Sequence, residues 1–183
     1  IGGSQPFRAS RRAGASGRAV TLSGSAGSHV RIQPSPSLGA FTNQITVTGW
    51  ANKRTAAQQG WVPIASRQLG TARDNQWYLG FFDGRPGFGV TTASGSADQN
   101  VSVATASPAQ QWIHLAGTYD GTTLRLYVNG VEAASRPKTG LLAVDNTRAV
   151  LLGANQNDNV TNSADLLFDG SVDEVRLYNT ALT

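Results

Sequence analysis

The 183-residue chain contains no cysteine and no methionine. Without cysteine, neither a disulfide framework nor a thiolate metal site can form, so a hydrophobic core alone must stabilise the fold. No uninterrupted apolar run approaches the ~20 residues that cross a membrane as a helix, and no signal-peptide segment precedes Gln5. Because the chain starts at Ile1 and lacks methionine, we expect a mature fragment or a module of a larger protein.

Acidic residues are fewer than basic ones, which gives a formal net charge of +4 and a sequence pI of about 10.0. Nucleic-acid binding would require a basic stripe with interleaved aromatic residues, whereas most arginines here are scattered singly. Four arginines cluster near the N-terminus, in a segment rich in glycine, serine and alanine: Arg8, Arg11, Arg12 and Arg18. We therefore predict a flexible or loosely attached lead-in over 1–16, one domain over 17–183 and no nucleic-acid partner. A mildly basic surface would also suit an acidic polysaccharide.

Short alternating apolar runs separated by turn residues follow one another along the chain, and no segment has the period of an amphipathic helix. Asp120-Gly121 and Asn129-Gly130 each join two such runs, and these dipeptides are strong hairpin signals. A further hairpin is expected between the runs Val20–Leu22 and His29–Ile32. The pattern predicts an all-β fold, an antiparallel two-sheet sandwich or jelly roll.

Residues 112–130 read Trp-Ile-His-Leu-Ala-Gly-Thr-Tyr-Asp-Gly-Thr-Thr-Leu-Arg-Leu-Tyr-Val-Asn-Gly. This segment resembles the Trp-x-His-Val-Ala-Gly-Thr-Tyr-Asp-Gly signature, ending in Tyr-Val-Asn-Gly, of the laminin G-like, concanavalin A-like jelly-roll superfamily. The opening strand from Gly17, the strand over 41–51 and the closing strand Phe168–Asn179 are similar to the corresponding blocks of that family. The resemblance covers about residues 17–182 and implies a jelly-roll β-sandwich that binds glycans or partner proteins.

The sequence has few residues suited to catalysis. Glycoside hydrolases of related sandwich folds use two carboxylates, but the closely alternating acids typical of them are missing and only two glutamates exist, Glu132 and Glu174. Asp173 and Glu174 are neighbours on one expected strand, so alternation would turn them to opposite faces. Neither a Gly-x-Ser-x-Gly elbow nor a phosphate loop occurs. We therefore predict that the domain is not an enzyme.

Calcium is the metal that this chain would hold, since its available ligands are oxygens. The resemblance implies that Asp173 helps to bind a structural calcium ion together with groups near the N-terminal strand. The family's acidic residue in the opening strand is replaced here by Ser23. The alternative for Asp173 is a hydrogen bond to neighbouring backbone or to an arginine.

A glycan site requires an aromatic ring against the apolar face of a sugar and polar groups for its hydroxyls. Trp61 and Trp77 flank a polar stretch over 66–76, and the loop over 155–165 adds amides and acids. Trp50 and Trp112 lie inside family strand motifs and are expected to pack against other residues of the protein. His114 lies in the same signature and is expected to be a hydrogen-bonded strand residue without a role in binding. The predicted carbohydrate-binding residues are Trp61, Arg67, Arg73, Asp74, Asn75, Trp77, Asn155, Asn157 and Asp158.

Two function classes follow from these observations, and a purely structural spacer is the third alternative. The first is a non-catalytic carbohydrate-binding module of a secreted or surface bacterial protein, with a polysaccharide or glycan as partner. The second is an extracellular adhesion or protein-recognition domain of laminin G-like type, whose sheet face or loop rim binds another protein. An exposed tryptophan or tyrosine bordered by amides would favour sugar, and a larger flat apolar patch would favour protein.

Overall fold

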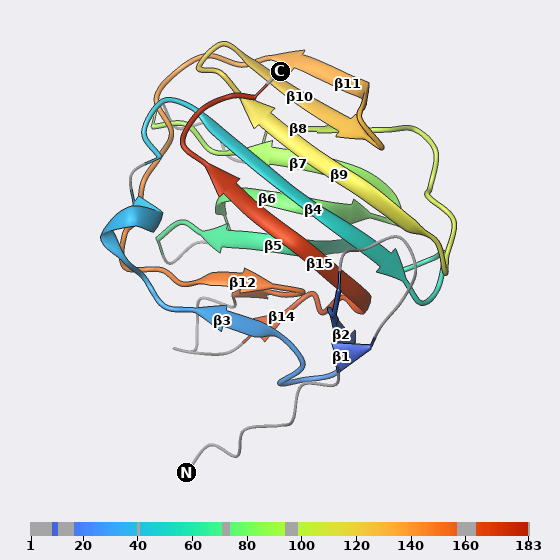
Figure 1. Cartoon of the computed structure of the whole chain (residues 1–183). Helices are drawn as coiled ribbons and strands as arrows, with labels where there is room; N and C mark the ends of the chain where they lie inside the picture. The colour runs from blue at the N-terminus through green and yellow to red at the C-terminus, as the bar shows by residue number, and fades with distance from the viewer. Residues whose placement is uncertain are drawn as a thin grey trace.

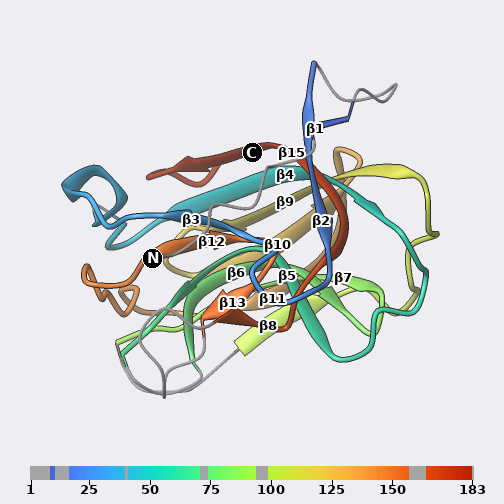
Figure 2. The ribbon, with the colours of Figure 1, turned by 90° about the horizontal axis from the view of Figure 1, so that it is seen from below.

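The computed structural model describes residues 9–10, 17–39, 41–70, 74–93, 99–156 and 164–182. Two antiparallel sheets, one of seven strands and one of six, pack face to face as the two layers of a sandwich (Figures 1 and 2). The predicted all-β jelly roll is confirmed. Among the described residues, no helix has the length and apolar character needed to span a membrane.

The seven-stranded sheet faces the viewer in Figure 1. Its strands, in spatial order, are β1 (Ala9–Ser10), β2 (Ala19–Ser23), β15 (Asp169–Tyr178), β4 (Ile45–Lys53), β9 (Trp112–Tyr119), β10 (Thr123–Val128) and β11 (Val131–Pro137).

The six-stranded sheet forms the second layer. Its strands, in spatial order, are β3 (Val30–Ile32), β12 (Val150–Leu152), β5 (Trp61–Gln68), β6 (Asn75–Phe82), β7 (Arg85–Val90) and β8 (Gln99–Ser102). A two-stranded ribbon consists of β13 (Asn155–Gln156) and β14 (Ala164–Asp165), and the short 3-10 helix η1 spans Pro36–Gly39.

Both predicted hairpin turns in the middle of the chain are present. β9 and β10 pair around the Asp120-Gly121 turn, where Gly121 has a φ of 89°. β10 and β11 pair around Asn129-Gly130, whose φ values of 51° and 81° are those that a tight two-residue hairpin requires. Glycine and asparagine accept such positive φ values more readily than other residues, so these turns form where the sequence predicts them.

The hairpin predicted between Val20–Leu22 and His29–Ile32 is wrong. β2 pairs with β15, with Val20 opposite Val172, whereas β3 pairs with β12 in the other sheet. The intervening residues therefore carry the chain from one layer to the other. Local alternation identifies a strand but not its partner, and here each partner lies more than a hundred residues away in the sequence.

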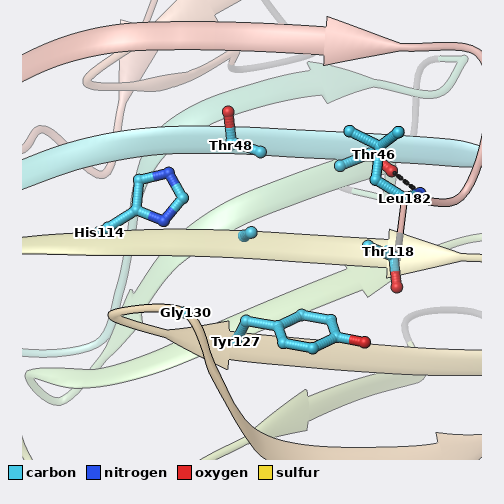
Figure 3. A pocket seen from close by; sticks show the side chains of 8 residues that line it. Thr46, Thr48, His114, Thr118, Tyr127, Gly130 and Leu182 are labelled. Carbon is cyan, nitrogen blue, oxygen red and sulfur yellow. Dashed lines mark hydrogen bonds between the residues drawn. The ribbon is translucent and has the colours of Figure 1, made fainter.

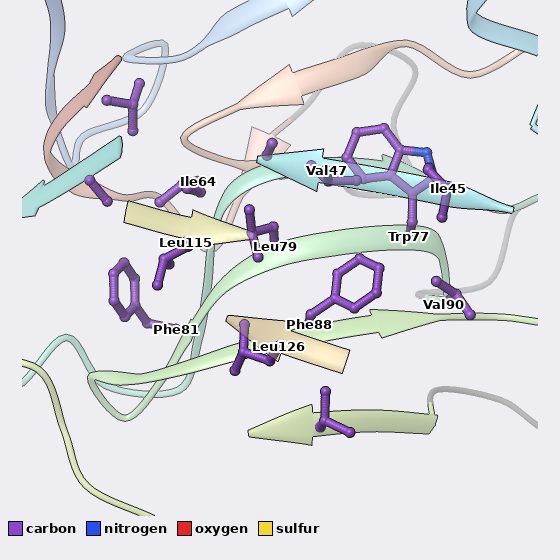
Figure 4. Packing of buried hydrophobic residues seen from close by; sticks show 14 of the residues in the cluster. Ile45, Val47, Ile64, Trp77, Leu79, Phe81, Phe88, Val90, Leu115 and Leu126 are labelled. Carbon is purple, nitrogen blue, oxygen red and sulfur yellow. The ribbon is translucent and has the colours of Figure 1, made fainter. Parts of the chain in front are cut away.

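The core fills the space between the two sheets (Figure 4). Ile45 and Val47 from β4 and Leu115 from β9 point inward from the seven-stranded sheet, and Trp77 and Phe88 face them from the six-stranded sheet. All five are fully buried. Each fully buried large apolar side chain contributes about 1.5–3 kcal/mol, so this layer supplies the stability that disulfides cannot.

The predicted lead-in over 1–16 lies outside the described residues except for Ala9 and Ser10. These two residues form β1 and pair with β2, with Ala9 opposite Val20. The division of the chain into a lead-in and a domain over 17–183 stays a prediction.

Candidate functional site

The outer face of the seven-stranded sheet carries an open surface built by strict alternation along β4 and β9. Because successive side chains of a strand point to opposite faces, burial of Ile45, Val47, Ile113 and Leu115 in the core turns their neighbours outward. The register pairs these outward residues in rows across the sheet: Trp50 with His114, Thr48 with Ala116, and Thr46 with Thr118. On β10, Tyr127 lies opposite Ala116 and continues the middle row.

A pocket of about 230 Å³ lies on this face. Its lining residues are Thr46, Thr48, His114, Ala116, Thr118, Tyr127, Gly130 and Leu182. The small side chains of β4 and β9 form the floor, and the His114 and Tyr127 rings and Leu182 rise around it (Figure 3). Small residues in the centre of the sheet face, bordered by larger ones, therefore make the hollow.

The C-terminal segment supplies one wall of the pocket. The Thr46 hydroxyl donates to the Thr180 carbonyl at 2.7 Å and accepts from the Leu182 amide at 2.9 Å. The Gln44 side-chain oxygen accepts from the Ala181 amide at 3.2 Å. These bonds hold Leu182 over Thr46 at the end of β4 (Figure 3).

The Asn129-Gly130 turn is fixed to the neighbouring strand. The Asn129 amide donates to the His114 carbonyl at 2.8 Å, and the His114 amide donates to the Asn129 side-chain oxygen at 2.9 Å. This double contact positions both Gly130 and the His114 ring at the pocket. The asparagine that permits the turn thus also orients the site.

His114 forms an aromatic contact with Trp50, with ring centroids 5.2 Å apart and an interplanar angle of 59°. Burial lowers the pKa of His114 below its ordinary value of 6.5, while nearby Glu174 raises it and Arg176 lowers it. The imidazole is therefore uncharged at neutral pH. Trp50 extends the ring surface of the pocket toward β15.

Several uncharged polar groups of the pocket are available to a ligand. Within the described part of the chain, the hydroxyls of the partly exposed Thr48 and Tyr127 have no hydrogen-bond partner in the protein. Each hydroxyl can donate one hydrogen bond and accept others. Together with the His114 imidazole, they offer both donors and acceptors to a ligand in the pocket.

Most of the carbohydrate-binding residues predicted from the sequence are buried instead. Trp77 is 0% exposed and lies in the core (Figure 4), which contradicts its prediction as a sugar platform. Arg67 is also fully buried, and its guanidinium donates to the carbonyls of Leu38 and Arg148. Asn75 and Asn155 are 2% and 4% exposed. These four side chains cannot meet a ligand without unfolding of their surroundings.

Trp61 is partly exposed, as predicted, but its backbone lies at the opposite end of β5 from Arg67. In the β5–β6 hairpin Trp61 pairs with Phe82, whereas Arg67 pairs with Trp77 at the opposite end. Arg67 is six steps along the strand from Trp61, about 20 Å at ~3.3 Å per residue. The tryptophan instead packs edge-on against Tyr78, with centroids 3.9 Å apart. The predicted grouping therefore fails because antiparallel pairing places its members at opposite ends of the hairpin.

The remaining predicted residues divide into two groups. Asp74 is partly exposed in the connection between β5 and β6. Arg73, Asn157 and Asp158 lie outside the described residues.

Asp173 fits a calcium site poorly. One of its carboxylate oxygens accepts from the Glu174 amide at 2.8 Å, and the other is buried without a partner, which a cation could satisfy. No cluster of three or more His, Cys, Asp or Glu side chains occurs in the described ranges. The pairing of β15 with β2 places Ser23 opposite Asp169 and ends at Val172, so no acid from the N-terminal strand faces Asp173. Structural calcium stays a prediction.

A bulge between Asp173 and Arg176 breaks the alternation of β15, and Glu174 adopts a φ of 47°. The expectation that Asp173 and Glu174 point to opposite faces, based on a regular strand, therefore does not apply. Glu174 instead forms an ion pair with Arg176 at 3.2 Å.

Sequence reasoning missed the pocket because it treated Trp50 and His114 as structural members of a family motif. Both side chains are partly exposed. The signal was present in the alternation itself, which places Thr46, Thr48 and Trp50 on the side opposite the core. What the alternation does not show is whether that side is open or covered.

Comparison with protein families identifies the group to which the fold belongs. A laminin G-type model, described as the concanavalin A-like lectin/glucanases superfamily, matches residues 23–183. The chain belongs to this superfamily. No curated protein sequence matches it.

Solved structures with this fold include several binding modules. The CBM40 module of the Ruminococcus gnavus IT-sialidase, solved with α2,3 sialyllactose, gives a TM-score of 0.73 at 16% identity over 90% of this chain and 91% of that one. Domain 4 of AbnA, an extracellular GH43 arabinanase from Geobacillus stearothermophilus solved with arabinotriose, gives 0.68 at 20% identity over 98% and 78%. The binding domain of botulinum neurotoxin DC, solved with rat synaptotagmin II, gives 0.69 at 12% identity over 97% of this chain and 43% of that one. At these identities the similarity shows the fold alone.

Proposed function

We propose that the domain is a non-catalytic carbohydrate-binding module and that its glycan occupies the pocket on the outer face of the seven-stranded sheet. The observation that carries the proposal is the combination of a small-residue floor, bordering rings and uncharged hydrogen-bonding groups in one hollow. A sugar presents a C–H face that packs on rings and hydroxyls that bond to groups such as Thr48 and Tyr127.

The size of the pocket suits one sugar residue. Sites for drug-sized ligands occupy roughly 300–1,000 Å³. The pocket, at about 230 Å³, is smaller than these and lies open on the sheet. The rest of a longer glycan would extend over the neighbouring sheet surface, where Trp50 offers a further ring.

The arrangement of the glutamates supports a binding role without hydrolysis. Glu132 is on β11 and Glu174 on β15, four strand positions apart in the seven-stranded sheet. At about 4.8 Å per strand this separation is ~19 Å, well beyond the ~9.5 Å upper limit for a two-carboxylate mechanism. Each glutamate also pairs with an arginine, Glu132 with Arg125 at 3.9 Å and Glu174 with Arg176 at 3.2 Å.

We place the domain in a secreted or surface bacterial protein, as one module of a longer chain. The support is its fold, which it shares with a domain of an extracellular arabinanase. Its composition, with many arginines and no cysteine, agrees with a bacterial module that needs no disulfides.

A glycan-array screen followed by isothermal titration calorimetry tests the proposal. Tyr127→Ala and His114→Ala should each weaken binding at least about tenfold, roughly 1.4 kcal/mol, because each removes a ring and a hydrogen-bonding group from the pocket. Phe82→Ala is the matched control, since Phe82 is 43% exposed on the opposite sheet. Its affinity should equal that of the unmodified domain.

Two results would contradict the proposal. One is a complete absence of binding across neutral and acidic glycans. The other is binding that survives both pocket substitutions, which would place the sugar elsewhere.

A protein-recognition role remains the second candidate. A neurotoxin binding domain of this fold was solved with a protein, synaptotagmin II, so the fold accepts a protein ligand in that case. Failure on the glycan array together with tight binding to an extracellular protein, abolished by Tyr127→Ala, would favour this candidate.

A further inference from the structure

The charge around the pocket differs in sign from the charge of the whole chain. The full sequence carries a net charge of +4. Within the described residues, six charged side chains lie on the outer side of the seven-stranded sheet between the level of Trp50 and the β9–β10 turn. They are Asp173, Glu174 and Arg176 on β15, Arg125 on β10, Glu132 on β11 and Asp120 in the turn. Four carboxylates face two arginines, which gives a local charge of −2.

Both arginines are already engaged by carboxylates. Arg125 donates to Asp120 at 2.5 Å and lies 3.9 Å from Glu132. Arg176 lies 3.2 Å from Glu174. An incoming anion would have to displace one of these carboxylates, and the displaced group would remain nearby.

The polar groups inside the pocket carry no charge that could compensate. Thr48 and Tyr127 offer hydroxyls, and His114 offers a neutral imidazole at pH 7. Neutral donors bind hydroxyl and amide oxygens well, but they stabilise a carboxylate less than a free guanidinium does. The pocket therefore has hydrogen-bonding capacity without a cation.

We infer that the pocket selects uncharged sugar residues and rejects carboxylated ones; this inference rests on the proposed glycan-binding function. A uronic or sialic acid would bring its carboxylate close to a sheet surface that already carries an excess of negative charge. The ligand carboxylate and the carboxylates around the pocket repel each other, and this repulsion is strongest at low ionic strength. The basic pI of the chain, which by itself suits an acidic polysaccharide, is thus a poor guide to this site.

Matched oligosaccharides that differ only by oxidation of C6 test the selectivity. Galactose-based against galacturonic acid-based oligosaccharides, and glucose-based against glucuronic acid-based ones, each pair with the same linkage and anomeric configuration, are titrated by calorimetry at pH 7 and low salt. In any pair that the domain binds, we expect the neutral oligosaccharide to bind at least about tenfold more tightly than the acidic one. The difference should shrink as salt is added, because added ions screen the carboxylates.

Glu174→Gln provides the complementary variant. It releases Arg176 from its ion pair and removes one negative charge beside the pocket, so binding of the acidic member should strengthen several-fold. Tyr127→Ala should weaken whichever member binds, which shows that the measurement reports on this pocket.

The outcomes separate the two proposals. Equal or tighter binding of the acidic member, lost in Tyr127→Ala, overturns the selectivity but leaves glycan binding in the pocket intact. No binding of either member in any pair, together with a blank glycan array, removes the proposed function and the inference with it.

Discussion

The two outer faces of the sandwich arise from the same alternation, yet only one of them is open at its centre. On the seven-stranded sheet, Trp50, His114 and Tyr127 remain partly exposed around a pocket. On the six-stranded sheet, the outward residues Ser66 and Tyr78 are each 1% exposed.

The six-stranded face is covered by chain that follows β12. The Ser66 hydroxyl donates to the Ala154 carbonyl at 2.8 Å, and Ala154 forms a second apolar cluster with Ala149, Leu151 and Leu167. The Tyr78 ring packs against Gly89, where an added Cβ would clash with the tyrosine hydroxyl. The centre of this face is therefore an extension of the protein interior.

Outward orientation of a side chain is therefore necessary for a binding site but is not sufficient for one. Trp77 and Tyr78 are neighbours on β6 that point to opposite sides, and both are buried. A face becomes available only where no later segment of the chain covers it. On the seven-stranded sheet, the C-terminal segment covers only the end of β4 and forms a pocket wall.

Loss of a core tryptophan should destabilise the domain more than any change on the open face. Trp77→Ala should destabilise the domain by about 3–5 kcal/mol, because it leaves a large cavity between the sheets. Tyr127→Ala, its counterpart on the open face, should change the free energy of unfolding by less than about 1 kcal/mol. Denaturant unfolding measures both. A stable Trp77→Ala domain would show that Trp77 is not part of the core.

A smaller loss of stability is expected from a substitution in the β9–β10 hairpin, which forms part of the open face. Gly121→Val should cost about 1–3 kcal/mol, since Gly121 has a φ of 89° and a Cβ there would approach the Asn43 side-chain oxygen to 2.8 Å. Gly130→Asn is the control, because its φ is also positive but no atom lies within 4 Å of an added Cβ. Equal melting temperatures for all three proteins would contradict this account of the turn.

Substitution of one tryptophan on each face tests which face binds the glycan. Trp50→Ala should weaken glycan binding about three- to tenfold, up to about 1.4 kcal/mol, because Trp50 extends the ring surface beside His114. Trp61→Ala, on the six-stranded sheet, should leave the affinity unchanged. Calorimetry with the same glycan decides between them. The reverse result would restore the site at Trp61 predicted from the sequence.

The smallest effect expected concerns Asp120, which orders the β9–β10 turn. Burial alone would raise the pKa of Asp120, but hydrogen bonds from Thr122, Arg125 and Thr123 lower it well below its ordinary value. Its folded-state pKa is thus below the unfolded one, so its contribution is complete above about pH 4–5 and is lost as the pH falls through the folded value. Asp120→Asn should cost roughly 1 kcal/mol at pH 7.

Thermal melts of both proteins between pH 7 and pH 2 check this sign. The difference in melting temperature between the unmodified domain and Asp120→Asn should narrow on acidification, because the Asp120 carboxylate of the unfolded chain binds a proton first and this favours unfolding. A difference in melting temperature that widens toward low pH would show that the fold does not stabilise Asp120 as a carboxylate.

The strands and the tight turns follow from local sequence patterns. Alternation around Ile45, Ile113 and Leu124 places one side of each strand in the core, and Asp120-Gly121 and Asn129-Gly130 accept the positive φ values that the turns need. These features depend on residues close together in the chain. The family resemblance added the way in which the strands assemble into a jelly roll.

The tertiary structure alone decided which of the outward residues form a site. Trp61 and Arg67 are close in sequence but lie at opposite ends of a hairpin, whereas Thr46 and Leu182, far apart in sequence, meet at the pocket. Strand pairing and the path of later segments determine these neighbours, and both depend on contacts across the whole chain. The residues of the pocket could therefore be identified as outward-facing from the sequence, but only the folded sheet brings them together and leaves them open.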